Sequence, residues 1–190
     1  MQDGWQEESS RTVFHHPVLS LRSVKRSLAG GPAAEFVVLA CPDWVNIVAE
    51  TPEGRVVLIR QFRHGSGARA LEIPGGMVDP GETPAQAARR ELREETGFEA
   101  GELVFLGKVN PNPALFNNTC HTFLAREAKP GGPASPEEHE RIEVLTVPRG
   151  ELLGLVRDGE IDHSLVVAAL TFYWLAQGGI AAPPGGPGGA

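Results

Sequence analysis

The sequence predicts an α/β fold in which helices cover the faces of a mixed β-sheet. Three observations support this fold class. Short β-branched runs recur between turn residues, one helix is marked by signals at both of its ends, and two more helices follow the last strand. The order of strands, helix, strands and helices is typical of a sheet with helices packed on it. The length of 190 residues indicates one domain with extensions.

Strands are expected where β-branched and aromatic residues gather between turn residues. The expected strands span 18–28, 35–40, 44–50, 55–62, 70–76, 103–109, 119–126 and 142–147. The third and fourth of these are separated by Thr51-Pro52-Glu53-Gly54, which predicts a hairpin. The first two strands precede this hairpin and are extra strands on the N-terminal side of the core.

The helix expected from Pro84 to Thr96 carries both start and stop signals. Thr83 is a good N-cap, and Gln86 closes a capping box with it. Gly97 stands where a left-handed residue ends a helix. The helical period predicts a core-facing stripe of Ala85, Ala88, Leu92 and Thr96. Two further helices are expected at 149–157 and 163–177.

The chain divides into one domain and two polar ends. Residues 1–11 are expected to be a flexible N-terminus, and residues 12–177 a single domain. Within it, 12–43 hold the N-terminal strands and 44–177 the core. The Gly- and Pro-rich residues 178–190 can bury almost nothing, so we expect a disordered tail.

The formal net charge of −7 comes from two segments. Residues 72–99 hold seven acids and three bases, and residues 137–143 hold four acids and one base. This acidity argues against nucleic acid or an anionic membrane as the main partner. Cys41 and Cys120 lie far apart in no redox or metal-binding spacing, which indicates reduced thiols. With no signal peptide and no membrane-spanning run, we expect a cytoplasmic protein.

Three glutamates of the helix at 84–96 gather within one arc beside the apolar stripe: Glu91, Glu94 and Glu95. Like charges at i,i+4 cost about 0.2–0.5 kcal/mol. One interpretation is a solvated face balanced by the arginines at 89, 90 and 93. The other is a divalent-cation site, because Mg²⁺ prefers carboxylate oxygens. Spacing alone leaves both open.

The same segment resembles the Nudix box, G-x5-E-x7-R-E-U-x-E-E-x-G-U, in which U is apolar. The defined positions are filled by Gly76, Glu82, Arg90, Glu91, Leu92, Glu94, Glu95, Gly97 and Phe98. A chance match has a probability on the order of 10⁻⁸ per starting position. The resemblance implies a Nudix-type α/β/α sandwich and a divalent metal, Mg²⁺ or Mn²⁺, on the box helix.

The resemblance also implies roles for the box residues. Glu91 and Glu95 would be the main metal ligands, and Glu94 a further ligand or a base. The carbonyl of Gly75 would be a backbone ligand. Arg90 would orient the glutamates through an ion pair and so support catalysis.

Residues 35–177 resemble the branch of this family that contains ADP-ribose pyrophosphatases and nucleotide-sugar hydrolases. In that branch Arg63 matches an arginine that touches the substrate; a plain surface charge is the alternative. Glu72 is a similar substrate-side carboxylate on the strand before the box, and Pro113 matches a proline that follows the box. Asn118 belongs to an asparagine cluster that either reads sugar hydroxyls or a base edge, or forms turns.

The second acidic segment, 136–144, matches a loop that in this branch brings a glutamate over the metals. Glu140 is the first candidate for this base or further ligand, and Glu138 the second; a solvated loop is the alternative for both. The histidines, His163 among them, show no ligand spacing.

The resemblance therefore implies a metal-dependent hydrolase of nucleoside diphosphate sugars. The first expectation is ADP-ribose, cut to AMP and ribose 5-phosphate. GDP-mannose or a broad nucleotide-sugar range is the alternative, and a catalytically silent ligand-sensing module is a distant one. Members of this branch are commonly homodimers joined through the N-terminal strands, so we expect a homodimer with contacts from residues 12–43.

Overall fold

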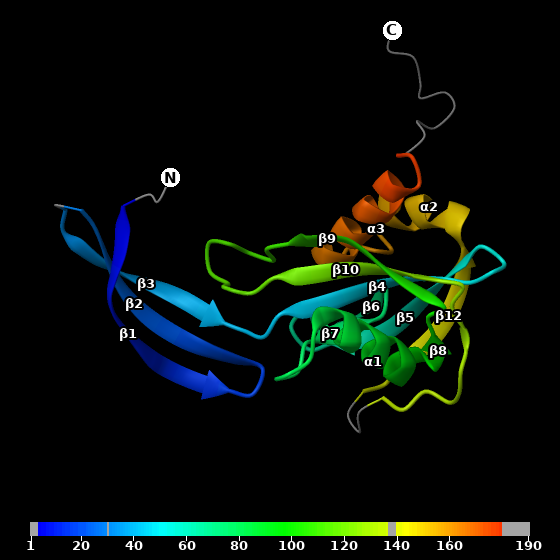
Figure 1. The fold of residues 1–190 in the computed structure, drawn as a ribbon, viewed down its shortest axis with the longest axis horizontal. Helices are drawn as coiled ribbons and strands as arrows, with labels where there is room; N and C mark the ends of the chain where they lie inside the picture. Colours follow the sequence, from blue (N-terminus) through cyan, green and yellow to red (C-terminus); the bar gives the residue numbers. More distant parts are fainter. Residues whose placement is uncertain (1–3, 30, 137–139, 180–190) are drawn as a thin grey trace, which may run out of the picture.

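The computed structural model describes residues 4–29, 31–136 and 140–179, and in it a small sheet projects from a larger body (Figure 1). The small sheet is antiparallel and consists of β1 (Trp5–His16), β2 (Leu19–Leu28) and β3 (Ala33–Ala40), in that order. The end of β3 is tied to the body, because the Leu39 N–H donates to the Leu115 carbonyl at 2.8 Å. The extra N-terminal strands are thus present as a separate layer.

Strand β1 corrects the expectation of a loose N-terminus up to residue 11. It begins at Trp5 and pairs with β2 along its whole length, from Trp5 opposite Leu28 to His16 opposite Leu19. All twelve of its residues are exposed. Backbone pairing rather than burial therefore holds this strand, which explains why its polar sequence gave no core signal. Of the expected tail, residues 180–190 lie outside the described residues.

The body is built on a mixed sheet with the order β12-β5-β4-β10-β9; β6 pairs with β5, and β7 with β4. Strands β4 and β10 run parallel, and the other neighbours are antiparallel. The bounds are β4 Trp44–Glu50, β5 Arg55–Arg63, β6 Ala68–Glu72, β7 Gly75–Met77, β9 Glu102–Val109, β10 Cys120–Arg126 and β12 Glu143–Pro148. The expected run 70–76 is thus two strands, and β8 (Phe98–Glu99) and β11 (Lys129–Pro130) form a small separate ribbon.

The helices cover both faces of this sheet. Helix α1 (Pro84–Thr96) has the predicted bounds, its capping box between Thr83 and Gln86 is formed, and Gly97 ends it with φ 72°. On the other face lie α2 (Leu152–Arg157), which follows the 3-10 turn Arg149–Glu151, and α3 (Ser164–Ala176). The α/β/α sandwich is therefore confirmed.

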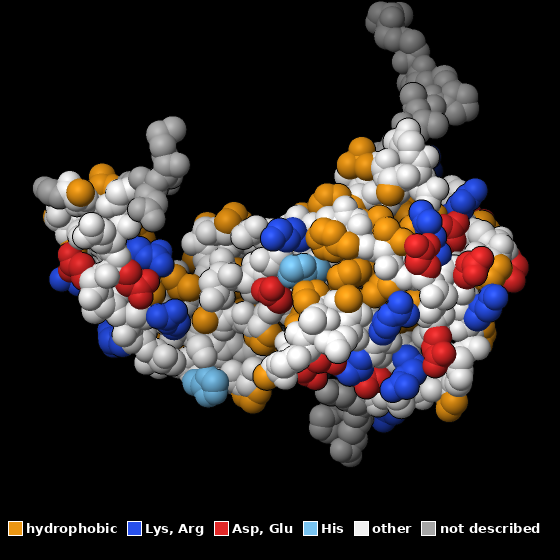
Figure 2. All heavy atoms as spheres, in the orientation of Figure 1, with side chains coloured by type: hydrophobic (Ala, Val, Ile, Leu, Met, Phe, Trp, Pro, Cys, Tyr) orange, Lys and Arg blue, Asp and Glu red, His pale blue; other side chains and the backbone are white. Residues whose placement is uncertain are grey.

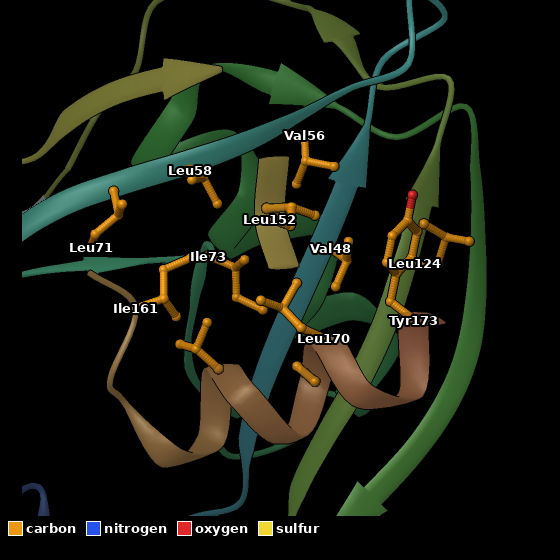
Figure 3. Close-up of a cluster of buried hydrophobic side chains, with 12 residues drawn as sticks. Val48, Val56, Leu58, Leu71, Ile73, Leu124, Leu152, Ile161, Leu170 and Tyr173 are labelled. Carbon is orange, nitrogen blue, oxygen red and sulfur yellow. The ribbon is translucent and has the colours of Figure 1, made fainter. Parts of the chain in front are cut away.

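Alternation along the central strands divides the core into two halves. Val45, Ile47 and Ala49 of β4 pack with α1, whereas Val48 packs on the opposite side with α2 and α3. Figure 3 shows that second half, in which Leu170 and Tyr173 of α3 lie against the strands. The layers thus follow from the two-residue period of the strands.

The buried stripe of α1 differs from the prediction at its start. Ala85 is exposed, and the buried residues of the helix are Ala87, Ala88, Leu92, Glu95 and Thr96. The helix is rotated so that Ala87, rather than Ala85, faces the sheet. This rotation places a carboxylate, that of Glu95, inside the protein.

Cys41 and Cys120 are both free thiols, as the sequence indicated. Burial raises the pKa of Cys120 to about 12, so this thiol is unreactive. In the described ranges, the helices are too short or too polar to span a bilayer.

Candidate active site

Arg90 lies at the centre of a carboxylate cluster on α1 and the loop before it. Its Nε and Nη2 each donate to one oxygen of Glu82 at 2.9 Å, which makes this pair bidentate. Its Nη1 donates to Glu91 at 2.9 Å and to Glu94 at 3.1 Å. Its Nη2 also donates to the Met77 carbonyl at 2.9 Å. Because three carboxylates share one planar guanidinium, Arg90 fixes their mutual positions.

The charges of this cluster act on one another. The hydrogen bonds to Glu82 hold the pKa of Arg90 above its usual range, and the same contact lowers the pKa of Glu82. Burial raises the pKa of Glu91, although Arg90 opposes this effect. Arg90 therefore compensates Glu82 more fully than Glu91.

Gly76 makes room for the carboxylate of Glu91. Strand β7 runs antiparallel to β4, with Gly76 opposite Val45. A Cβ atom on Gly76 would clash with the Glu91 carboxylate, so a larger residue here would displace that carboxylate. The glycine of the box thus lets the Glu91 carboxylate keep its position against β7.

Glu95 is the most buried carboxylate of the box. Its side chain accepts a hydrogen bond from the Gly75 N–H at 2.9 Å, and only 4% of the residue is exposed. Burial raises the pKa of Glu95 to about 8, and the negative charges of Glu91 and Glu140 act in the same direction. The interpretation of the box glutamates as a merely solvated face therefore fails for Glu95.

Glu140 belongs electrostatically to this cluster. Its charge raises the pKa of both Glu91 and Glu95 and also acts on Arg63. The second acidic segment thus comes close to the box helix at this residue. Glu138, the other candidate, lies outside the described residues.

The side chains of Arg63, at the end of β5, and Glu72, at the end of β6, meet across the β5–β6 hairpin. The Nε of Arg63 donates to the two oxygens of Glu72 at 3.0 and 3.2 Å. Glu72 is buried, while 45% of the Arg63 side chain is exposed. The hydrogen bonds with Glu72 raise the pKa of Arg63, and the negative charges of Glu95 and Glu140 raise it further. The structure therefore places these two predicted residues beside the box cluster.

Two residues beside Glu72 were not predicted from the sequence. The Nε2 of Gln61 donates to Glu72 at 3.4 Å, and the Nδ1 of His163 lies 3.5 Å from it. Two signals in the sequence point to them. Gln61 interrupts an apolar strand, and His163 occupies the position before α3, where a capping residue is usual.

Pro113 and Asn118 lie in the connection between β9 and β10. Pro113 is exposed. Asn118 is buried, and its Nδ2 donates to the Pro42 carbonyl at 2.9 Å. Two other asparagines of the cluster accept hydrogen bonds from backbone N–H groups. Asn112 accepts from the N–H of Ala114, and Asn117 accepts from the N–H of Cys41. Turn chemistry thus accounts for Asn112, whereas Asn117 ties this connection to the residue after β3. The substrate contacts of Pro113 and Asn118 stay predictions.

The donors of the box fit a hard divalent cation. In the part of the chain that the structure describes, no three His, Cys, Asp or Glu side chains form a ready-made cage. Mg²⁺, however, binds through one or two carboxylates and takes its other ligands from water and substrate phosphates. Glu91 supplies a half-buried carboxylate and Glu95 a buried one, and their raised pKa values reflect the cost of their negative charge. A cation would offset that cost.

Comparisons with known proteins agree with this geometry. Residues 42–170 match the NUDIX domain. An ADP-ribose pyrophosphatase of Bacillus subtilis (strain 168) is 30% identical over 87% of this chain and 90% of its own. An ADP-ribose pyrophosphatase of Mycobacterium tuberculosis (strain ATCC 25618 / H37Rv) is 30% identical over 92% and 86%. The crystal structure of an ADP compounds hydrolase superposes with a TM-score of 0.80 at 26% identity, covering 93% of this chain and 97% of that one.

Proposed function

The chain belongs to the Nudix family of hydrolases, and we propose that it cuts the pyrophosphate bond of a nucleoside diphosphate sugar, with ADP-ribose as the first candidate. The observation that carries this proposal is the half-buried Glu91 and the buried Glu95 beside Gly75 and Gly76, with Arg90 holding the cluster. Two relatives that align over most of the chain are named ADP-ribose pyrophosphatases, which supports the substrate. The products would be AMP and ribose 5-phosphate.

Glu91, Glu95 and the Gly75 carbonyl would hold the metal, with Glu94 as a further ligand. When bound, Mg²⁺ or Mn²⁺ would neutralise the diphosphate and acidify a water for in-line attack on phosphorus. Arg90 keeps the carboxylates in place and is a positioning residue.

A carboxylate must accept the proton of the attacking water. Glu94 and Glu140 are the candidates, because Glu94 is partly exposed on the box helix and the charge of Glu140 acts on both Glu91 and Glu95. Glu138 stays a second candidate from the same loop. Arg63 offers N–H donors to the anionic substrate from the rim of the site, and Glu72 orients the Arg63 guanidinium. Pro113 and Asn118 would complete the sugar or base side.

The test is a panel of nucleotide sugars incubated with the protein and Mg²⁺ or Mn²⁺. We expect release of the nucleoside monophosphate, fastest from ADP-ribose. Faster cleavage of GDP-mannose, or similar rates with many nucleotide sugars, would select the alternative specificity. Tight binding without product would support a ligand-sensing module and refute the hydrolase.

We further propose a homodimer formed through the N-terminal sheet. Its apolar side chains are exposed, with exposed fractions of 40–56% for Trp5, Val13, Phe14, Phe36 and Val37. Figure 2 shows hydrophobic side chains among the charged ones on this projecting sheet. An unsupported sheet with apolar side chains is typical of an association surface.

Solution mass decides the dimer. Phe14→Asp combined with Val37→Asp should convert a dimer into a monomer in multi-angle light scattering, whereas a monomeric wild type would refute the proposal. The two free thiols support a reducing compartment, and we propose the cytoplasm. Cell fractionation checks this assignment.

A further inference from the structure

The carboxylate of Glu72 is buried at the end of β6, outside the box. Only 2% of the residue is exposed. A buried charge is costly unless it is paired and hydrogen-bonded. Glu72 must therefore be surrounded by donors, and their arrangement shows what this carboxylate does.

The donors around Glu72 come from two elements, β5 and the start of α3. Arg63 donates hydrogen bonds to both oxygens of Glu72: its Nε lies 3.0 Å from Oε1, and its Nη2 donates to Oε2. Gln61 donates to Oε2 at 3.4 Å. On the Oε1 side stands His163, with its Nδ1 at 3.5 Å. Each carboxylate oxygen thus has the arginine and one further side chain beside it.

His163 is unusual for its place in the chain. It occupies the N-cap of α3, where Ser, Thr, Asn or Asp would stabilise the helix, and its side chain makes no capping hydrogen bond. Its Nδ1 is buried and has no hydrogen-bond partner that meets geometric criteria among the described residues. Glu72 Oε1 is the acceptor it faces. The helix therefore forgoes a cap, and the ring is directed at Glu72.

We propose that His163 is a positioning residue that acts through Glu72 on Arg63. Its Nδ1–H donates to Oε1 of Glu72, which fixes the plane of the carboxylate and thereby the direction of the Arg63 guanidinium. This inference rests on the proposed function, in which Arg63 contacts the anionic substrate.

The surrounding charges explain why Arg63 needs such a support. Its side chain is 45% exposed and long, so it has many rotamers in water. Glu95 and Glu140 also attract it, as their charges raise its pKa together with Glu72. If the Arg63 side chain paired with those glutamates instead, it would compete with the metal for their carboxylates. A Glu72 carboxylate fixed by His163 keeps Arg63 at the rim, and substrate binding then requires less ordering.

Two substitutions at His163 separate positioning from folding. His163→Ser supplies a good helix cap but no donor that reaches Glu72, whereas His163→Asn places an N–H donor close to the position of Nδ1. We expect His163→Ser to raise KM for ADP-ribose about 3- to 10-fold with kcat nearly unchanged, because it removes one hydrogen bond to a charged group. His163→Asn should restore most of the affinity. The midpoint temperature of thermal unfolding should be no lower in either variant than in the wild type.

Control variants show whether the effect passes through Arg63. Arg63→Ala should raise KM by itself, and adding His163→Ser to it should cause no further rise. His121→Ser is the matched control, since His121 forms a similar pair with Asp43 at 3.1 Å that shares no residue with this cluster. It should leave KM unchanged.

Three results would overturn the inference: an unchanged KM in His163→Ser, an equal rise in the Arg63→Ala background, or a KM rise that His163→Asn does not reverse. Binding of ADP-ribose measured by calorimetry in EDTA gives a second readout without turnover. It should show the same loss of affinity in His163→Ser. Hydrolysis by the wild type decides the proposed function separately, so the two failures are distinguishable.

Discussion

Replacing Glu95 by Gln should stabilise the metal-free protein while it abolishes activity. The pKa of Glu95 rises from its ordinary 4.5 to about 8 in the folded protein, chiefly through burial. The folded state thus holds this proton to higher pH than the unfolded chain does. Stability is therefore lost as pH rises from about 4.5 to about 8, where the folded protein finally ionises the group. Gln keeps the shape and the acceptor for the Gly75 N–H, but never carries the charge.

The size of the effect follows from the pKa difference of about 3.5. At about 1.4 kcal/mol for each tenfold change, the full cost of ionising Glu95 is about 5 kcal/mol above pH 8. Between pH 5 and pH 8, the free energy of unfolding of the wild type should fall by about 3.5 kcal/mol relative to Glu95→Gln. Charges elsewhere are common to both proteins and largely cancel in this comparison.

The assay is urea unfolding of the two proteins in EDTA at pH 5, 6, 7 and 8. The difference between them should widen steadily with pH. Adding Mn²⁺ at pH 8 should stabilise the wild type and have little effect on Glu95→Gln. Hydrolysis by the variant should fall by orders of magnitude. Glu102→Gln, which removes an exposed carboxylate, is the control and should retain activity. Parallel stability profiles for wild type and Glu95→Gln would refute the assignment of a buried, charge-destabilised carboxylate.

Two further substitutions test the surroundings of the metal ligands. Gly76→Ala should lower kcat about 100-fold, because the new methyl group displaces the Glu91 carboxylate; Gly150→Ala, which meets open space, should have no effect, and an active Gly76→Ala would contradict the close approach. Arg90→Lys should lower the rate about 10- to 100-fold and raise the Mg²⁺ concentration needed for half-maximal rate, because one ammonium cannot bridge the three carboxylates. A normal metal dependence in Arg90→Lys would show that the cluster keeps its geometry without the guanidinium.

Local signals in the sequence predicted most of the fold. The capping box and the left-handed Gly97 fix both ends of α1, and these signals depend on residues within one turn of the helix. Strand β1 escaped prediction for the opposite reason. Its residues are all exposed and most of them are polar, and the pairing with β2 that stabilises it leaves no pattern in composition.

The candidate site divides in the same way. The box spacing predicted Arg90 and its glutamates, because they lie on one helix and in the loop before it. The buried support of Arg63 could not be read from spacing, since Gln61, Glu72 and His163 come from three separate elements. The rotation of α1 could not be predicted from the spacing of apolar residues either. The helical period gives the width of the apolar face better than its exact centre.

The uneven distribution of compensating charge identifies where a cation would act most strongly. Arg90 gives Glu82 two hydrogen bonds and shares its Nη1 donors between Glu91 and Glu94. Glu95 receives a backbone N–H, which does not offset burial and the repulsion from Glu91 and Glu140. The cost of burying this negative charge thus offsets part of the favourable free energy of folding. A divalent cation would recover the most free energy at Glu95, so folding prepares this position for metal and, through the metal, for an anionic substrate.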